Sequence, residues 1–135
     1  LTVANDVTWN AGNAWVFELG TAASSLALAN SGSSTQDLLL LTGVGSDFLK
    51  GTGSTFTFDF AGSGAAGWYK LVDWTGTTGF VAGDFAATNL GSGLSGTFTV
   101  DSGTSALYLN VVPEPSTWLL LSAGLMTTLI FRRRR

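Results

Sequence analysis

The stretch STFTFDF, residues 54–60, is the segment that decides how this chain folds. Its three phenylalanines occupy every second position, with threonine, threonine and aspartate between them. Successive side chains of a β-strand point to opposite faces of a sheet, so this alternation places the three rings together on one buried face. The stretch therefore predicts a strand with an aromatic inner face and a polar outer face.

Other segments have the composition of strands. In residues 106–112, Leu107, Leu109 and Val111 fall on one side, whereas residues 37–43 are apolar on both sides and predict a strand that is covered on both faces. In residues 68–74 we expect Lys70 and Asp73 near the ends of a strand or on an open edge. The predicted strands, besides residues 54–60, are AWVFEL (14–19), DLLLLTG (37–43), WYKLVDW (68–74), GTFTV (96–100) and ALYLNVV (106–112).

Glycine-rich turns separate these segments, and no helical period lies between them. Gly, Ser, Thr, Ala and aromatic residues dominate, whereas Lys, Glu and Gln, the usual solvent-facing helix formers, are scarce. The pattern predicts an all-β domain. Two architectures fit it, a β-sandwich and a few coils of a β-solenoid.

Composition excludes several classes of function. The chain has no Cys and no His, which removes disulfides, thiolate nucleophiles, imidazole catalysis and Cys/His zinc sites. Residues 1–112 hold two lysines against eight carboxylates, a formal charge of −6, so nucleic-acid binding is not expected. The chain begins with Leu1 rather than Met, and we expect its true start, with any signal peptide, to lie upstream.

The C-terminal tail has a different composition. Residues 117–131 carry no charge, and as a helix they would cover roughly 22 Å, short of the ~30 Å hydrocarbon core of a bilayer. A cluster of four arginines follows, Arg132, Arg133, Arg134 and Arg135. Because positive charge stays on the cytoplasmic side, the tail predicts a short transmembrane helix over about 117–131, with residues 1–112 outside the membrane. An ordinary permanent anchor and a buried core helix are the alternatives.

The order of features in this tail resembles the PEP-CTERM sorting signal. Pro113, Glu114 and Pro115 precede the apolar segment, and the arginine cluster closes the chain. The resemblance covers residues 112–135 and implies that Pro113–Pro115 form the recognised motif and that the arginines act as the stop-transfer cluster.

This resemblance also implies partners and a location. An exosortase would read the signal, and the segment would hold the protein transiently at the inner membrane of a Gram-negative bacterium until processing. The processed protein would reach the cell surface or the extracellular matrix, often together with biofilm material and exopolysaccharide.

Residues 13–112 show a second resemblance, to the closing segment of autotransporter-like and PEP-CTERM β-helix repeat proteins. It is carried by DLLLLTG, FTFDF, WYKLVDWTGTTGF and LSGTFTVDSGTSALYLNVV. It implies a right-handed parallel β-helix of which this chain would be the C-terminal part, with the β-sandwich as the alternative.

Several motifs resemble functional sites but are explained equally well by structural roles. GSGAAG (62–67) matches a dinucleotide-binding pattern, but a predicted strand follows it where that mechanism needs a helix, so we interpret it as a turn. Asp59 and Asp73 are the best candidates for a catalytic carboxylate pair, yet nothing in the sequence places them together. Trp68 and Trp74 could stack against a sugar, although aromatic residues at alternating positions more often fill a core.

These observations together predict an exported β-rich domain over residues 1–112 and a sorting signal over residues 113–135. We expect a non-enzymatic protein without metal or cofactor, with a structural or adhesive role in the cell envelope or matrix. The alternatives are a carbohydrate-binding module that contacts exopolysaccharide through exposed tryptophans, and a small hydrolase that uses paired aspartates.

Overall fold

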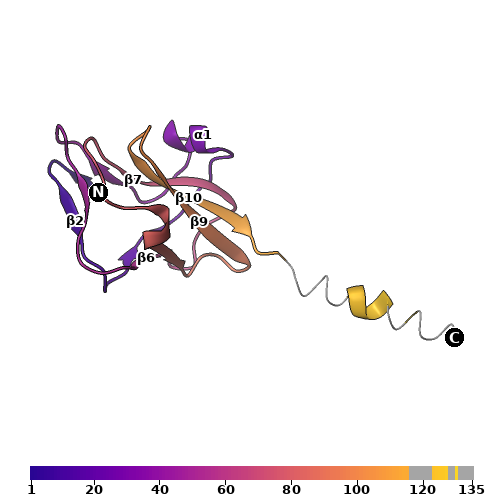
Figure 1. Cartoon of the computed structure of the whole chain (residues 1–135). Helices are drawn as coiled ribbons and strands as arrows, with labels where there is room; N and C mark the ends of the chain where they lie inside the picture. Colours follow the sequence, from indigo (N-terminus) through magenta and orange to yellow (C-terminus); the bar gives the residue numbers. More distant parts are fainter. Residues whose placement is uncertain (116–122, 128–129, 131–135) are drawn as a thin grey trace.

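The computed structural model describes residues 1–115, 123–127 and 130, and these are mostly β (Figure 1). The strands are short at the start of the chain and longest at the end of the domain. In chain order the elements are β1 (Thr2–Val3), β2 (Val7–Trp9), β3 (Trp15–Val16), α1 (Leu26–Asn30), β4 (Leu39–Leu41), β5 (Phe48–Lys50), β6 (Phe56–Asp59), β7 (Gly67–Asp73), the 3-10 helix η1 (Ala82–Asp84), β8 (Phe85–Thr88), β9 (Leu94–Asp101) and β10 (Ala106–Pro113).

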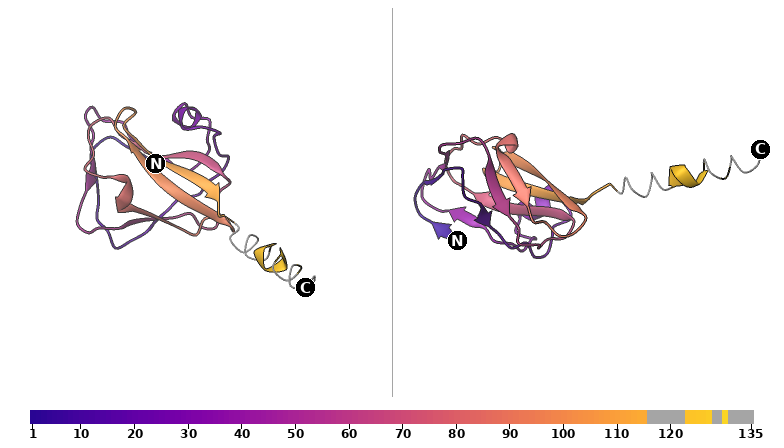
Figure 2. Two further views of the ribbon diagram at one scale, coloured as in Figure 1. Left: turned by 45° about the vertical axis from the view of Figure 1, so that its right-hand side comes forward. Right: turned by 90° about the horizontal axis from the view of Figure 1, so that it is seen from below.

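The strands form three sheets that surround one interior (Figure 2). The largest has the order β1-β4-β7-β10-β9, and the others are β2-β5 and β3-β6-β8. The chain visits the three sheets in the same order on its first two passes and pairs each strand in parallel with the corresponding one of the next pass. On the third pass, β7 and β8 again pair in parallel with their predecessors.

The end of the domain departs from this parallel scheme. β10 pairs antiparallel with both β7 and β9, so the large sheet changes from parallel to antiparallel at β7. The prediction of an all-β fold is confirmed in its coarse form, since the chain is mostly strand. The pairing does not by itself establish a solenoid.

The strand predicted from STFTFDF forms the centre of the core. Phe56 and Phe58 of β6, and Phe60 just beyond it, are fully buried, while Thr57 and Asp59 on the other face are half-buried. The ring of Phe58 lies 5.0 Å from those of Trp9 and Phe17 and 5.6 Å from that of Phe98, measured between centroids. The pairs with Trp9 and Phe17 are edge-to-face and the pair with Phe98 is stacked, and both arrangements are favourable beyond the area they bury. β6 thus joins aromatic residues of several passes into one core.

The last strands follow the predicted alternation. Leu107, Leu109 and Val111 of β10 point into the main core, whereas Ala106 and Tyr108 point to the opposite face of the sheet. The helix α1, which the sequence did not reveal, covers that opposite face.

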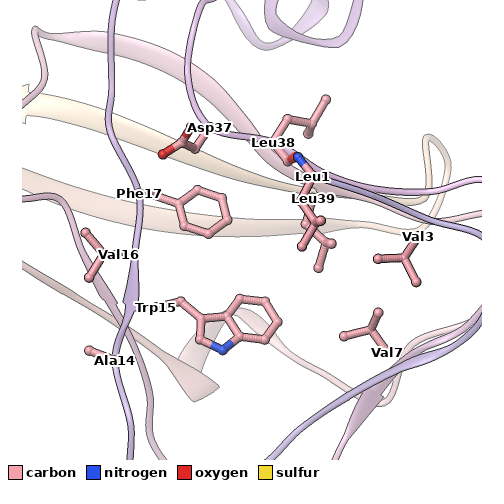
Figure 3. A pocket seen from close by; sticks show the side chains of 10 residues that line it. All are labelled: Leu1, Val3, Val7, Ala14, Trp15, Val16, Phe17, Asp37, Leu38 and Leu39. Atoms are coloured by element: carbon pink, nitrogen blue, oxygen red, sulfur yellow. The ribbon is translucent and has the colours of Figure 1, made fainter.

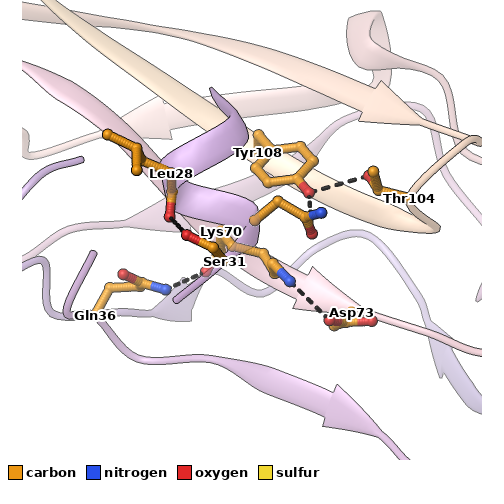
Figure 4. Close-up of polar contacts among 8 residues, drawn as sticks. Leu28, Ser31, Gln36, Lys70, Asp73, Thr104 and Tyr108 are labelled. Carbon is orange, nitrogen blue, oxygen red and sulfur yellow. Dashed lines mark hydrogen bonds and ion pairs between the residues drawn. The ribbon is translucent and has the colours of Figure 1, made fainter. Parts of the chain in front are cut away.

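The helix α1 is held by side-chain hydrogen bonds (Figure 4). The Ser25 hydroxyl accepts a hydrogen bond from the Leu28 amide at 3.3 Å and caps the helix N-terminus. The Tyr108 hydroxyl bonds to Asn30 Oδ1 at 2.8 Å and to Thr104 Oγ1 at 3.0 Å. Because an isolated helix of one turn is unstable in water, packing and these bonds account for α1.

One prediction about β7 holds only in part. Asp73 is the last residue of the strand, as expected, but Lys70 lies within it, and β7 lies between β4 and β10, so neither residue occupies an open edge. Their side chains form an ion pair at 3.0 Å on the outer face, beside α1 (Figure 4). The register between β7 and β10 shifts by one residue between Lys70 and Val72, and this shift places two side chains three positions apart on the same face of the sheet.

The predicted transmembrane helix over 117–131 lies mostly outside the described residues. Within that span, residues 123–127 and 130 are helical and exposed. Among the residues that the structure describes, no helix is both long and apolar enough to cross a membrane. The arginine cluster, residues 132–135, also lies outside the described residues.

Candidate functional site

The proline-glutamate-proline motif begins inside the last strand of the domain. Pro113 is the final residue of β10 and is the register partner of Leu94, the first residue of β9. The Glu114 amide then donates a hydrogen bond to the Gly93 carbonyl at 2.8 Å. The first two residues of the motif are therefore an extension of the β9–β10 ladder and not part of a free linker.

A proline at position 113 is compatible with the β9–β10 pairing. Backbone amides along an antiparallel strand alternate between facing the partner and facing away from it. Since the Glu114 amide faces β9, position 113 would direct its amide away from β9, and a proline there removes no ladder bond. Pro113 to Pro115 are all exposed, so the motif is accessible although its first two residues are held against β9.

The tryptophans that were predicted to contact carbohydrate have different environments. Trp74 is only 3% exposed and packs in the main core, so it offers no ring face to a sugar and the prediction does not hold for it. Trp68 is half-buried and packs against the cluster of Ala23, Ala29, Ala106 and Tyr108 beneath α1. A carbohydrate contact through Trp68 stays a prediction.

A third tryptophan, Trp15, lines an open apolar pocket of about 490 Å³ (Figure 3). Its ring stacks on that of Trp9 with 4.0 Å between centroids. Phe17, Val3 and Val7 also contribute to the lining, and the Asp37 carboxylate lies at one side (Figure 3). One oxygen of that carboxylate accepts a hydrogen bond from the Glu18 amide at 2.9 Å.

The two candidate catalytic carboxylates are not brought together. Asp59 belongs to β6 and Asp73 to β7, which lie in different sheets. Hydrogen bonds from the Ala61 amide and the Asn89 side chain hold the pKa of Asp59, at the end of β6, below its ordinary value and favour its ionised form. Asp73 is occupied by its ion pair with Lys70. The lowered pKa of Asp59 is the opposite of the raised pKa that a general acid needs.

Asp84 is the carboxylate with the most unusual environment. It is 8% exposed, and its two oxygens accept from Lys50 Nζ at 2.5 Å and from the Val81 amide at 2.8 Å. Burial opposes its ionisation, but the hydrogen bonds and the charge of Lys50 outweigh that effect and lower its pKa. The pair fixes η1 to β5. In the described part of the chain, no group of three or more acidic residues is placed to hold a metal ion.

Comparison with known proteins identifies the tail. Residues 111–135 match the model of the PEP-CTERM protein-sorting motif. The match includes the predicted motif Pro113–Pro115 and the arginine cluster, and it implies exosortase-dependent export and sorting with processing by an exosortase. No curated protein and no solved structure matches the chain. The predicted resemblance of residues 13–112 to β-helix repeat proteins is not supported by these comparisons.

Proposed function

We propose that this chain is an exported, non-enzymatic envelope or matrix protein whose C-terminal segment holds it at the inner membrane until an exosortase processes it. The observation that carries the proposal is the sorting-motif match over residues 111–135, which begins within the folded domain. After processing, the β domain would act at the cell surface or in the extracellular matrix in a structural or adhesive role.

The position of the motif supports a membrane-proximal domain before processing. Only one residue, Ser116, separates Pro115 from the start of the uncharged segment at residue 117. A fully extended chain spans at most about 3.6 Å per residue, so the segment starts within roughly 7 Å of Pro115. The end of the domain that carries β9 and β10 would therefore face the membrane.

Hydrogen bonds between successive passes support a structural role. Directly before β2, the Asp6 carboxylate accepts a hydrogen bond from the Asp47 amide at 2.9 Å. Asp47 directly precedes β5, and its carboxylate accepts in turn from the Thr77 amide at 2.5 Å. Directly after β2, Asn10 Oδ1 accepts from the Thr52 amide at 2.9 Å. Such side-chain ladders fix the turns of each pass to the next and favour a rigid domain.

We further infer that the three passes are a short stack of parallel coils, which the β9–β10 hairpin closes at one end. The repeated order of the sheets and the parallel register of Thr8 with Leu49 support this arrangement. Since the chain has no cysteine, Thr8→Cys with Leu49→Cys should form a disulfide on mild oxidation. Thr8→Cys with Thr57→Cys, in a different sheet, is the control and should not.

Intact-mass measurement of the exported protein tests the sorting proposal. We expect the form released from the membrane to lack the arginine cluster, and a strain without the exosortase to accumulate the unprocessed chain. Finding Arg135 on protein released from wild-type cells would contradict the proposal.

Carbohydrate binding is a second candidate function, and the Trp15 pocket is the observation that favours it. An aromatic ring beside a carboxylate acceptor is a combination that can hold a sugar, with the ring stacking on its apolar face and the carboxylate bonding its hydroxyls. A pull-down with the exopolysaccharide of the producing strain, comparing the wild type with Asp37→Asn, tests it. Binding that is absent from both proteins would remove this candidate.

A further inference from the structure

The sorting motif adjoins a groove between two sheet edges. β8 is the last strand of one sheet and β9 the last strand of another, and together with the loop between them they line a groove of about 540 Å³. Glu114 lines the same groove and is the only charged residue among those that form it. The groove is therefore continuous with the motif.

Small residues keep the backbone of this groove accessible. Its walls include Ala86 and Ala87 of β8 and Ser95 and Gly96 of β9. A Cβ added at Gly96 would lie 2.8 Å from Leu109 Cδ1 and 3.5 Å from Ala87 Cβ, so a larger residue there would require the Leu109 side chain to shift. A ligand in the groove would meet main-chain groups and an apolar floor.

The register of β9 shows which of its amides face the groove. The bond from the Glu114 amide to the Gly93 carbonyl makes these two residues a hydrogen-bonded pair. By alternation, Ser95 and Thr97 bond to β10, whereas the amides of Gly96 and Phe98 point to the open edge. An open edge of this kind is the surface to which an extended peptide adds as a further strand.

We propose that this groove is a second docking surface for the enzyme that processes the C-terminal signal, and that it binds an extended, basic segment of that enzyme. The inference rests on the proposed function. The enzyme must reach Pro113–Pro115, and the groove is the surface that the domain presents directly beside them. Glu114 at the rim, in a domain of net negative charge, favours a basic partner.

A groove residue that lies outside the recognised motif should affect binding and not chemistry. Ser92 is exposed, lines the groove and lies outside the motif. With membranes that contain the enzyme and the purified full chain, we expect Ser92→Arg to raise the KM of processing about tenfold at unchanged kcat. Ser92→Glu, which adds similar bulk with the opposite charge, should raise KM less. Ser24→Arg, at an exposed site outside the groove, is the matched control and should behave as the wild type.

Two further measurements keep the test independent of any folding defect in the variants. Residues 112–135 fused to an unrelated carrier should be processed with a KM raised about tenfold relative to the full chain. In a complex of the full chain with a cleavage-inactive enzyme, the amides of Gly96 and Phe98 should exchange more slowly than in the free chain.

The outcomes separate the two proposals. If the wild type is processed, and Ser92→Arg and the carrier fusion both have the same KM as the wild type, the groove inference alone is overturned. A dimer in sedimentation that Ser92→Arg dissociates would also overturn it, because the groove would then bind a second copy. Absence of any processing of the wild-type chain would instead refute the proposed function.

Discussion

Replacing Phe58 with alanine should produce the largest loss of stability from any single change in β6. The side chain is fully buried, and its ring lies within 5.0–6.2 Å of six other aromatic rings. Burying a phenylalanine contributes about 1.5–3 kcal/mol, and the cavity left behind brings the cost of Phe→Ala to about 3–5 kcal/mol. A domain of this size has a free energy of unfolding of about 5–15 kcal/mol, so the loss would be a large share of the total.

Urea unfolding of the purified chain, followed by near-ultraviolet circular dichroism of the buried aromatic residues, measures this loss. Phe58→Leu should cost about 1–1.5 kcal/mol because most of the volume is kept. Thr57→Ala, on the opposite face of the same strand, should cost less than about 1 kcal/mol. If Phe58→Ala costs no more than Thr57→Ala at an unchanged denaturant slope, the assignment of the inner face of β6 is wrong.

Substitutions test two other contacts. Lys50→Met leaves the Asp84 carboxylate buried without its cation and should cost about 1–3 kcal/mol at pH 7. The lowered pKa of Asp84 means that its contribution is present above the ordinary aspartate pKa and is lost as the pH falls through the folded-state pKa, so the gap between wild type and Lys50→Met should narrow toward pH 3; a gap that does not change with pH would contradict this. Gly43→Ala should destabilise the domain, since its Cβ would lie 2.0 Å from the Ala4 carbonyl oxygen, whereas Gly83→Ala meets no atom within 4 Å and should be close to neutral in thermal unfolding. Equal melting temperatures for the two glycine variants would refute the close approach at Gly43.

The sequence predicts best where the signal is local. The alternation in residues 54–60 and 106–112 identifies β6 and β10 together with their buried faces, because each strand is long enough to show a period of two. The early strands contain only two or three residues and show no such period. β1, β2 and β5 were therefore missed as separate elements.

The missed elements depend on contacts between distant residues. α1 has five residues, and its Asn30 is hydrogen-bonded to Tyr108, which lies 78 positions further along the chain. No local sequence pattern therefore predicts this helix. The parallel register of β2 with β5 is indicated in the sequence by one weak similarity. DVTW (6–9) and DFLK (47–50) each have an aspartate directly before the strand. That aspartate makes the bond between passes, which becomes evident only once the two segments are known to be adjacent.

The candidate site was found in part. The order of proline, glutamate, apolar segment and arginines suffices to locate the sorting motif, because its residues are contiguous in the sequence. Its attachment to β9 was missed, although the strand ALYLNVV runs directly into Pro113 in the sequence. The choice of Trp74 as a sugar contact failed because alternation indicates which residues share a face but not which face is covered.

Topology in intact cells tests the central claim most directly, and the absence of cysteine makes it simple to measure. Val44 is fully exposed on the domain and Leu41 is fully buried, so Val44→Cys is a surface reporter and Leu41→Cys its matched control. On intact spheroplasts, a membrane-impermeant maleimide should label Val44→Cys without permeabilisation and should leave Leu41→Cys unlabelled until the protein is denatured. Labelling of Val44→Cys only after the inner membrane has been permeabilised would place the domain in the cytoplasm and contradict the account.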